Sequence, residues 1–258
     1  MSARILYTPN SEKPFQLSRS RLDNFLSCPR CFYLDCREGL RQPPSFPFTL
    51  NNAVDRLLKT EFDTYRKKQY QHPIMKKCGI DGVPYTHEQL SDWRLTTTGK
   101  GMRYLYPGTN LDIMGSPDDI WLVELGPVQQ KKLCVVDYKA TSSMSPVHAI
   151  EDDWWARYKR QLDIYVWLLK KQDVEFEVSQ VGYFLLVNGD SQRKDFNWTL
   201  HFEPHIVKYV ADDSWVDGAI QNAHTCLLET YLPMPSKDCA YCAYVKSAND
   251  HQAMNMLK

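Results

Sequence analysis

The sequence predicts an α/β fold, with a central mixed β-sheet that carries acidic side chains at one end and is flanked by helices. The first observation is a pair of apolar segments, 111–123 and 132–139, joined by a Gly-Pro turn in the pattern of an antiparallel hairpin. The second is a pair of segments, 50–70 and 154–171, whose apolar residues recur at helical spacing. Strands and long amphipathic helices that share one chain are typical of a sheet covered by helices.

Composition bounds the class of protein. The chain has 258 residues, 43% of them hydrophobic, and its length suits one sizeable domain. No apolar run approaches the roughly 18–20 residues of a membrane span, and residues 1–7 lack the apolar core of a signal peptide. We therefore expect a cytoplasmic protein, in which the eight cysteines are reduced thiols or metal ligands. The 31 basic and 31 acidic residues balance, which disfavours a protein that coats nucleic acid but permits an enzyme with a basic groove.

The N-terminal third is predicted to be helical after an irregular entry. Ser18 or Ser20 can cap a helix that runs to Leu34, and Pro29 can occupy the first turn of a second helix. A proline-rich connector, 41–47, then leads to the helix at 50–70. Residues 71–110 are the hardest part of the chain to interpret. Within them, the segment 86–89 has the pattern of a capping box and predicts a helix that reaches Trp93.

The C-terminal half is predicted to contain a helix, a strand pair and a last helix. In the helix 154–171, Gln161 and Tyr165 are four apart and therefore share a face. The Asn-Gly pair at 188–189 predicts a hairpin turn. The remaining predicted elements are strands at 178–187 and 196–202 and a helix at 214–229.

The end of the strand 132–139 carries the residues that suggest chemistry. Its apolar run ends in Asp137 and Lys139, which point the same way because side chains alternate along a strand. Charged groups at the end of a buried strand are costly unless they have a partner or a use. A second carboxylate, Asp118, lies on the facing strand, whereas Asp119 points to the opposite side. Hard oxygen ligands of this kind suit Mg²⁺ or Mn²⁺. The plain alternative is an exposed strand end that happens to carry an acid and a lysine.

Two C-x-x-C pairs stand near opposite ends of the chain. Because C-x-x-C places two thiolates on one metal, two such pairs form a four-sulfur site, and the spacing alone suggests zinc. The four ligands would be Cys28, Cys31, Cys239 and Cys242. The other cysteines are interpreted as core or surface thiols: Cys36, Cys78, Cys134, which we expect to be buried, and Cys226.

Three motifs together resemble the PD-(D/E)XK nuclease superfamily. They are Gly115-x-x-Asp118, Asp137-x-Lys139 and Gln161-x-x-x-Tyr165, and they occur in that family's order and spacing. The sequence is most similar to the RecB-like branch, which includes nuclease domains of recombination helicase–nucleases and CRISPR-associated exonucleases. The resemblance extends over about 17–244 and implies a restriction-endonuclease-like core in a single nuclease domain, 1–258.

The resemblance also implies a metal site. Asp118 and Asp137 would bind Mg²⁺ or Mn²⁺, together with the main-chain carbonyl of Tyr138. The family's helix ligand, more commonly histidine, is matched here by Asp55, which can equally be an ordinary acid on a helix surface.

Three further residues receive roles from the resemblance. Lys139 would orient a water or stabilise charge on the phosphate. Gln161 and Tyr165 would contact DNA or position the lysine, although ordinary amphipathic packing explains their spacing as well.

For the cysteines, the resemblance implies an iron–sulfur cluster at which segments 17–36 and 234–244 meet. Relatives join one N-terminal cysteine to three C-terminal ones, whereas this sequence offers two and two. Zinc therefore remains the alternative, and some relatives keep the Cys-Pro motif without any metal.

The function that these features predict is metal-dependent hydrolysis of phosphodiester bonds, as an exodeoxyribonuclease in DNA repair, recombination or foreign-DNA processing. The partners would be single-stranded DNA or duplex ends, with any helicase or recombination protein on a separate chain and no membrane. The alternative is a catalytically silent nucleic-acid-binding or scaffolding module that keeps a nuclease fold.

Overall fold

The computed structural model describes residues 5–44, 49–97, 99–142, 150 and 155–256. The chain divides into two compact units, each assembled from separate segments. The first contains residues 1–45, 105–113 and 215–258, and the second contains 46–104 and 114–214. No helix in the described ranges is long and apolar enough to cross a membrane.

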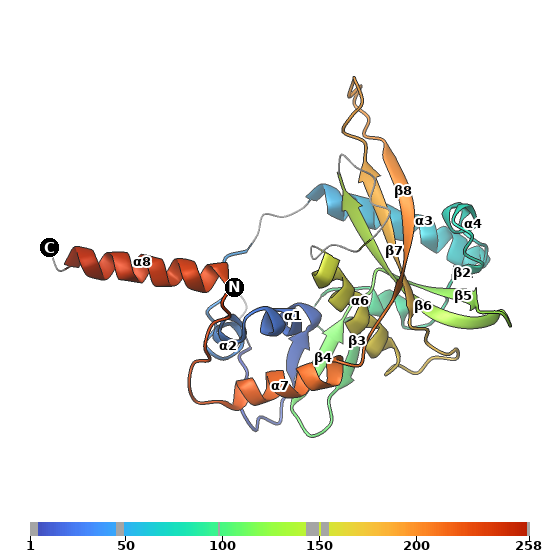
Figure 1. Ribbon diagram of the computed structural model, residues 1–258. Helices are drawn as coiled ribbons and strands as arrows, with labels where there is room; N and C mark the ends of the chain where they lie inside the picture. The colour runs from blue at the N-terminus through green and yellow to red at the C-terminus, as the bar shows by residue number, and fades with distance from the viewer. Residues whose placement is uncertain (1–4, 45–48, 98, 143–149, 151–154, 257–258) are drawn as a thin grey trace. The chain divides into compact units, whose positions relative to one another are not determined.

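A five-stranded mixed sheet forms the centre of the second unit (Figure 1). The spatial order is β2-β5-β6-β7-β8, with bounds Gly82–Pro84, Asp119–Leu125, Gln130–Thr141, Val181–Gly189 and Phe202–Val210. Strands β6 and β7 are parallel and the other neighbours are antiparallel. A parallel pair needs a long crossover, and helix α6 (Ala156–Leu169) lies in that connection. The predicted mixed sheet and the hairpin of β5 with β6 are therefore confirmed. The first part of the predicted strand 111–123 is not in this hairpin, because it forms β4 (Leu111–Gly115) in a separate three-stranded sheet of order β1-β4-β3.

Two helices cover opposite faces of this sheet. Helix α3 (Thr49–Lys68) buries Phe62 in a core cluster with Val136 and Tyr138 of β6. The residue between these two, Asp137, accepts a hydrogen bond from Gln161 of α6. Because neighbouring side chains of a strand point to opposite faces, α3 packs on one face of β6 and α6 on the other. Both helices were predicted, and the expected start of α6, Trp154, lies outside the described residues.

The predicted return strand at 196–202 is wrong. The ladder pairs Asn188 with Glu203 and Gly189 with Phe202, so the Asn-Gly pair belongs to β7 and the chain reverses in the loop 190–201. Within that loop, Asn197 and Trp198 have φ values of 43° and 58°. Asn188 and Gly189 do not form a turn here, because continued pairing with β8 satisfies the main-chain hydrogen-bonding groups of β7. Figure 1 shows this pair of strands as a long hairpin.

The expected capping-box helix at 86–93 is also wrong in part. Only α5 (Leu90–Trp93) is helical, and its N-cap residue, Gln89, makes no side-chain capping bond. Instead, Nδ1 of His87 accepts from the N–H of Gln89 at 3.2 Å, which forms a local turn. The same region contributes α4 (Pro73–Lys77) and β3 (Met102–Leu105), which neighbours β4 (Leu111–Gly115).

The first unit is mostly helical. It contains β1 (Phe15–Ser18), α1 (Arg19–Ser27), α2 (Pro29–Arg37), α7 (Val216–Leu228) and α8 (Ala240–Met256). The predicted cap is confirmed, since the hydroxyl of Ser18 accepts from the N–H of Arg21 at 3.3 Å. The chain does not form one helix to Leu34, because Cys28 is extended, with φ −161°. Pro29 then begins α2 as predicted. The helix α8 was not predicted.

Candidate functional site

The acid and lysine of β6 lie together as their alternation predicts. Asp137 is fully buried, and its carboxylate forms an ion pair with the ammonium of Lys139, whose side chain is 19% exposed. Burial alone would lower the pKa of Lys139, but the charges of Asp137 and Asp118 outweigh it and raise the pKa above its usual value. The ammonium of Lys139 therefore acts as a donor in this contact.

Gln161 connects this ion pair to helix α6. Its Nε2 donates to Oδ1 of Asp137 at 2.8 Å and to the hydroxyl of Tyr165 at 3.1 Å. Its Oε1 accepts from Nζ of Lys139 at 3.4 Å. The ammonium of Lys139 also lies 4.8 Å from the ring centroid of Tyr158, one turn before Gln161 on the same helix. One amide thus holds the acid, the lysine and the tyrosine of the predicted motifs in a single network.

Asp118 immediately precedes β5 and contacts two different elements. Its Oδ2 accepts from the main-chain N–H of Tyr138 at 2.7 Å, which fixes it beside the strand that carries Asp137. Its Oδ1 accepts from Nζ of Lys59 at 3.1 Å, and the same ammonium donates to Oδ2 of Asp55 at 3.0 Å. Lys59 therefore joins Asp55 of α3 to Asp118.

Lys59 was not among the predicted site residues. The signal that could have identified it is its position four residues after Asp55 on a predicted helix, the spacing of an ion pair. Burial and then the charge of Asp118 raise the pKa of Asp55 above its usual value. Burial lowers the pKa of Lys59, but the charges of Asp118 and Asp55 raise it by more.

Asp119 points away from this cluster, as predicted. It is fully buried and its Oδ1 accepts from Nη2 of Arg66 at 2.6 Å. Its Oδ2 accepts from the hydroxyl of Tyr138 at 3.0 Å and from Nε1 of Trp121 at 3.2 Å. Both oxygens thus have several partners in the core on the α3 face of the sheet.

The aspartate cluster, formed by Asp55, Asp118 and Asp137, offers ligand types that suit a cation. Its donors are carboxylate oxygens, which Mg²⁺ and Mn²⁺ prefer, and a cation already lies between two of them in the form of the Lys59 ammonium. Over the part of the chain that the structure describes, however, Asp55, Asp118 and Asp137 do not converge as a group of three ligand atoms; the four cysteines do.

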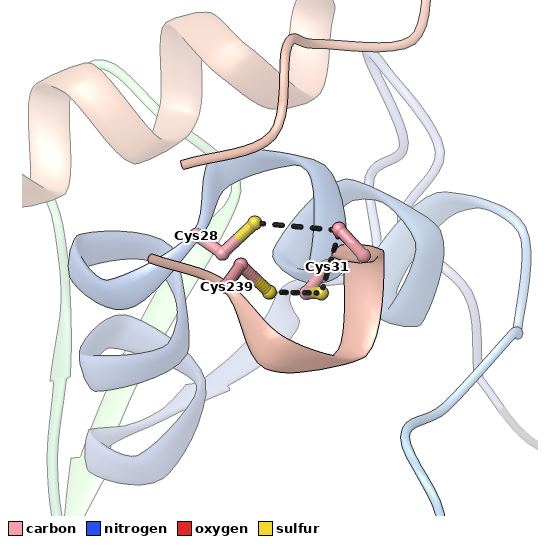
Figure 2. Close-up of side chains that lie close together, drawn as sticks. Cys28, Cys31 and Cys239 are labelled. Carbon is pink, nitrogen blue, oxygen red and sulfur yellow. Dashed lines mark hydrogen bonds between the residues drawn. The ribbon is translucent and has the colours of Figure 1, made fainter. Parts of the chain in front are cut away.

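The cysteines form a compact four-sulfur cluster in the first unit (Figure 2). The sulfur atoms all lie within 4.8 Å of one another. Sγ of Cys31 is 3.6 Å from those of Cys239 and Cys242, and Sγ of Cys28 is 3.9 Å from that of Cys242. Sulfurs about 2.3 Å from one tetrahedral ion would be separated by about 3.8 Å. The predicted meeting of the N- and C-terminal segments is confirmed, and the donor set fits a metal.

The thiols of the cluster have unlike environments. Burial would raise the pKa of Cys28, but hydrogen bonds from the main chain of Cys31 and Ser236 outweigh it and lower the pKa to about 7. Burial raises the pKa of Cys31 to about 11. Of the remaining cysteines, Cys134 and Cys36 are buried in the core and Cys78 is exposed.

Comparison with known protein families shows a match for most of this chain. The family model described as the PD-(D/E)XK nuclease superfamily matches residues 49–247, which include the whole aspartate cluster and both C-terminal cysteines. A search of curated proteins finds no match for this chain.

Proposed function

Because the chain belongs to the PD-(D/E)XK nuclease superfamily, we propose that it is a Mg²⁺- or Mn²⁺-dependent exodeoxyribonuclease of the RecB-like branch. The observation that carries the proposal is the network in which Gln161 holds both Asp137 and Lys139 by hydrogen bonds. We also propose a single nuclease domain over 1–258, since the family match, 49–247, takes in residues of both compact units.

In this proposal Asp118 and Asp137 would hold the divalent ion, with the carbonyl of Tyr138. The chemistry that such an ion supplies is polarisation of a phosphate oxygen and a lower pKa for a water molecule. The N–H of Tyr138 keeps Asp118 against β6 through a bond of 2.7 Å, so the two carboxylates are held by one strand. A rigid placement of this kind lowers the cost of ordering the site around a substrate.

Lys139 supplies a positive charge at the reacting phosphate. Its raised pKa keeps it protonated, so it stabilises negative charge that develops on the phosphate and orients the attacking water by donating to it. Gln161 is a positioning residue, because its amide contacts both Asp137 and Lys139. Tyr165, whose hydroxyl accepts from Gln161, supports it from one turn further along α6.

We further propose that the four cysteines hold a metal centre that ties the chain ends together. Three of the sulfur separations, at 3.6 to 3.9 Å, favour a single tetrahedral ion such as zinc. The resemblance to RecB-like nucleases favours an iron–sulfur cluster. Metal analysis of protein purified without air separates these two identities: iron and sulfide with a brown colour indicate the cluster, and one equivalent of zinc indicates the single ion.

The experiment that tests the enzyme is a cleavage assay on end-labelled single-stranded and duplex DNA, with an RNA strand in parallel. Activity is measured with Mg²⁺, Mn²⁺ or EDTA for the wild type, Lys139→Ala and the control Lys131→Ala, an exposed lysine on the same strand. We expect metal-dependent cleavage that Lys139→Ala abolishes and Lys131→Ala retains, and the product ladder reports exo- or endonucleolytic action. A folded protein that binds DNA and metal without cleaving would overturn the proposal in favour of a silent binding module.

We also propose a cellular setting for this activity. We place the protein in the cytoplasm, where it would process DNA ends during repair, recombination or removal of foreign DNA. A helicase or recombination protein on a separate chain would supply those ends. A nuclease that starts at DNA ends degrades single strands or duplex termini. A helicase produces single strands, and an earlier endonucleolytic cut produces duplex termini.

A further inference from the structure

The ammonium of Lys59 lies between two carboxylates that belong to different elements. It donates to Oδ2 of Asp55 at 3.0 Å and to Oδ1 of Asp118 at 3.1 Å. The three side chains are 23%, 38% and 21% exposed, respectively, so this contact is partly sheltered from water. A position between two carboxylate oxygens is where a divalent ion would otherwise bind.

We propose that Lys59 is a resident cation of the nuclease site: it fills the position between Asp55 and Asp118 and so limits the site to one divalent ion. Asp55 then serves as the positioning residue that holds Lys59, in place of the metal-ligand role that the resemblance implies. This inference rests on the proposed function, because it concerns the number of ions that the same site binds.

An ordinary helix ion pair does not explain the arrangement. Asp55 and Lys59 are one turn apart on α3, and such a pair forms on an exposed helix without help. The contact with Asp118 is different, because that residue is 59 positions away in the chain and immediately precedes β5. Lys59 thus links a helix to the sheet at the point where the predicted metal ligands gather, as a bound ion would.

The balance of charge favours a single ion. The carboxylates of Asp55, Asp118 and Asp137 carry a formal charge of −3, and the ammonium groups of Lys59 and Lys139 carry +2, which leaves −1. One divalent ion brings the site to +1, which a phosphodiester anion neutralises. A second divalent ion would bring it to +3 with Lys59 in place, and like charges at such short range repel strongly.

The number of ions can be counted by passing the protein into metal-free buffer without a chelator, titrating it with Mn²⁺ and following free Mn²⁺ by electron paramagnetic resonance. The proteins are the wild type, Lys59→Met, which keeps the stem and removes the charge, and Lys68→Met, an exposed lysine at the end of the same helix. Asp118→Ala gives the background from binding elsewhere. Thiolates favour softer metals than Mn²⁺, so the cysteines add little to the signal.

We expect one Mn²⁺ site in the wild type and in Lys68→Met, and two in Lys59→Met. Two sites in the wild type, or one in Lys59→Met, would overturn the inference and leave the proposed nuclease standing. No site in any of the proteins would overturn the proposed function and the inference with it.

Thermal melting supplies a second measurement that does not depend on counting bound Mn²⁺ ions. Without Lys59, the carboxylates of Asp55 and Asp118 repel each other, so Lys59→Met should melt below the wild type in EDTA. Mn²⁺ should then raise its melting temperature by more than that of the wild type, because a further ion binds the folded state. An equal rise in the two proteins contradicts a vacated cation position. Lys59→Arg, which keeps the charge, should behave as the wild type.

Discussion

At the residue scale, the buried charge of Asp119 is balanced by partners at both of its carboxylate oxygens. Asp119 is fully buried, and its carboxylate has Arg66, Tyr138 and Trp121 as hydrogen-bond partners. Arg66 also donates to Asp63 at 3.0 Å and to the carbonyl of Tyr85. The pair therefore joins α3 to the sheet, and its contribution to stability depends on both members being present.

Removing the arginine should be severe. In Arg66→Met the volume is similar, but the carboxylate of Asp119 is left buried without its counter-charge, which costs about 3–5 kcal/mol. Denaturant unfolding of this variant is compared with that of Lys67→Met, an exposed neighbour on the same helix, for which we expect a change within about 0.5 kcal/mol. Equal stabilities of the two variants would show that the buried pair contributes little.

Substitutions of the neighbouring residues Asp118 and Asp119 should have different effects, one on cleavage and the other on stability. Asp118→Ala removes a proposed metal ligand from the partly exposed cluster, so cleavage should be lost while the fold is retained. Asp119→Asn removes the charge that faces Arg66, so it should lower the melting temperature but keep activity per folded molecule. Cleavage assays and melting curves on both variants check this, and the reverse pattern would assign the metal-ligand role to Asp119.

At the element scale, a glycine determines how closely α6 approaches β4. A Cβ atom at position 115 would lie 2.7 Å from Cε1 of Tyr165 and 2.8 Å from Cδ1 of Leu168. Such distances are shorter than van der Waals contact, so a side chain here would displace the helix that carries Gln161. The glycine of the first predicted motif is therefore a packing requirement of the site.

Gly115→Ala should accordingly destabilise the protein by about 1–3 kcal/mol through overpacking and reduce cleavage because α6 shifts. The matched control is Gly218→Ala in α7, where an added Cβ meets no atom within 4 Å. That change should stabilise its helix by about 0.5–1 kcal/mol. Denaturant unfolding of the two variants gives the comparison, and a neutral Gly115→Ala would show that α6 yields without cost.

The histidine at the start of α4 should make stability depend on pH. Nδ1 of His72 accepts from the N–H of Ile74 at 3.2 Å, and Nε2 lies 3.0 Å from Oε1 of Glu61. Burial lowers the pKa of His72 below its usual value, although Glu61 acts in the opposite sense. A proton on Nδ1 would remove the acceptor that caps the helix.

The direction in which stability changes with pH follows from the difference in proton binding between the folded and unfolded states. Because the folded pKa lies below the unfolded value of about 6.5, the unfolded state binds the proton first. The contribution of His72 is fully present above about pH 6.5 and is lost as the pH falls through the lowered pKa. Melting temperatures between about pH 7.5 and pH 5 should fall more steeply for the wild type than for His72→Asn, which can cap but does not titrate. Parallel curves would contradict the assignment.

At the scale of the whole chain, the cysteine cluster closes a long loop. Cys31 and Cys239 are 208 positions apart, and their sulfurs lie 3.6 Å from each other. A metal on these thiolates ties the two segments in the folded state and restricts the unfolded chain if it stays bound. The first unit contains both segments, so such a metal would help to hold this unit together.

Cys242→Ser, or removal of the metal by a chelator, should therefore lower stability by roughly 3–5 kcal/mol, the range for a cross-link that closes a long loop. Proteolysis should also begin within α2 or α8. The control is Cys78→Ser, an exposed cysteine outside the cluster, which should melt as the wild type does. If Cys242→Ser melts with the control, no metal ties these segments.

The sequence alone was sufficient for features that depend on local periodicity. Alternation along a strand placed Asp137 and Lys139 on one face and Asp119 on the other. Helical spacing identified α3 and placed Gln161 beside Tyr165. The two C-x-x-C pairs predicted their own meeting, because each pair is half of a tetrahedral donor set.

Only the tertiary structure decided the contacts between elements that no periodicity connects. Lys59 meets Asp118 because α3 packs beside the start of β5, and Arg66 meets Asp119 for the same reason. The hairpin turn moved from Asn188-Gly189 to the loop 190–201 because pairing with β8 outweighs a local turn preference. Local propensities act over a few residues, whereas the partners of a buried charge come from wherever packing brings them, so the composition of the site beyond its motifs is a property of the folded chain.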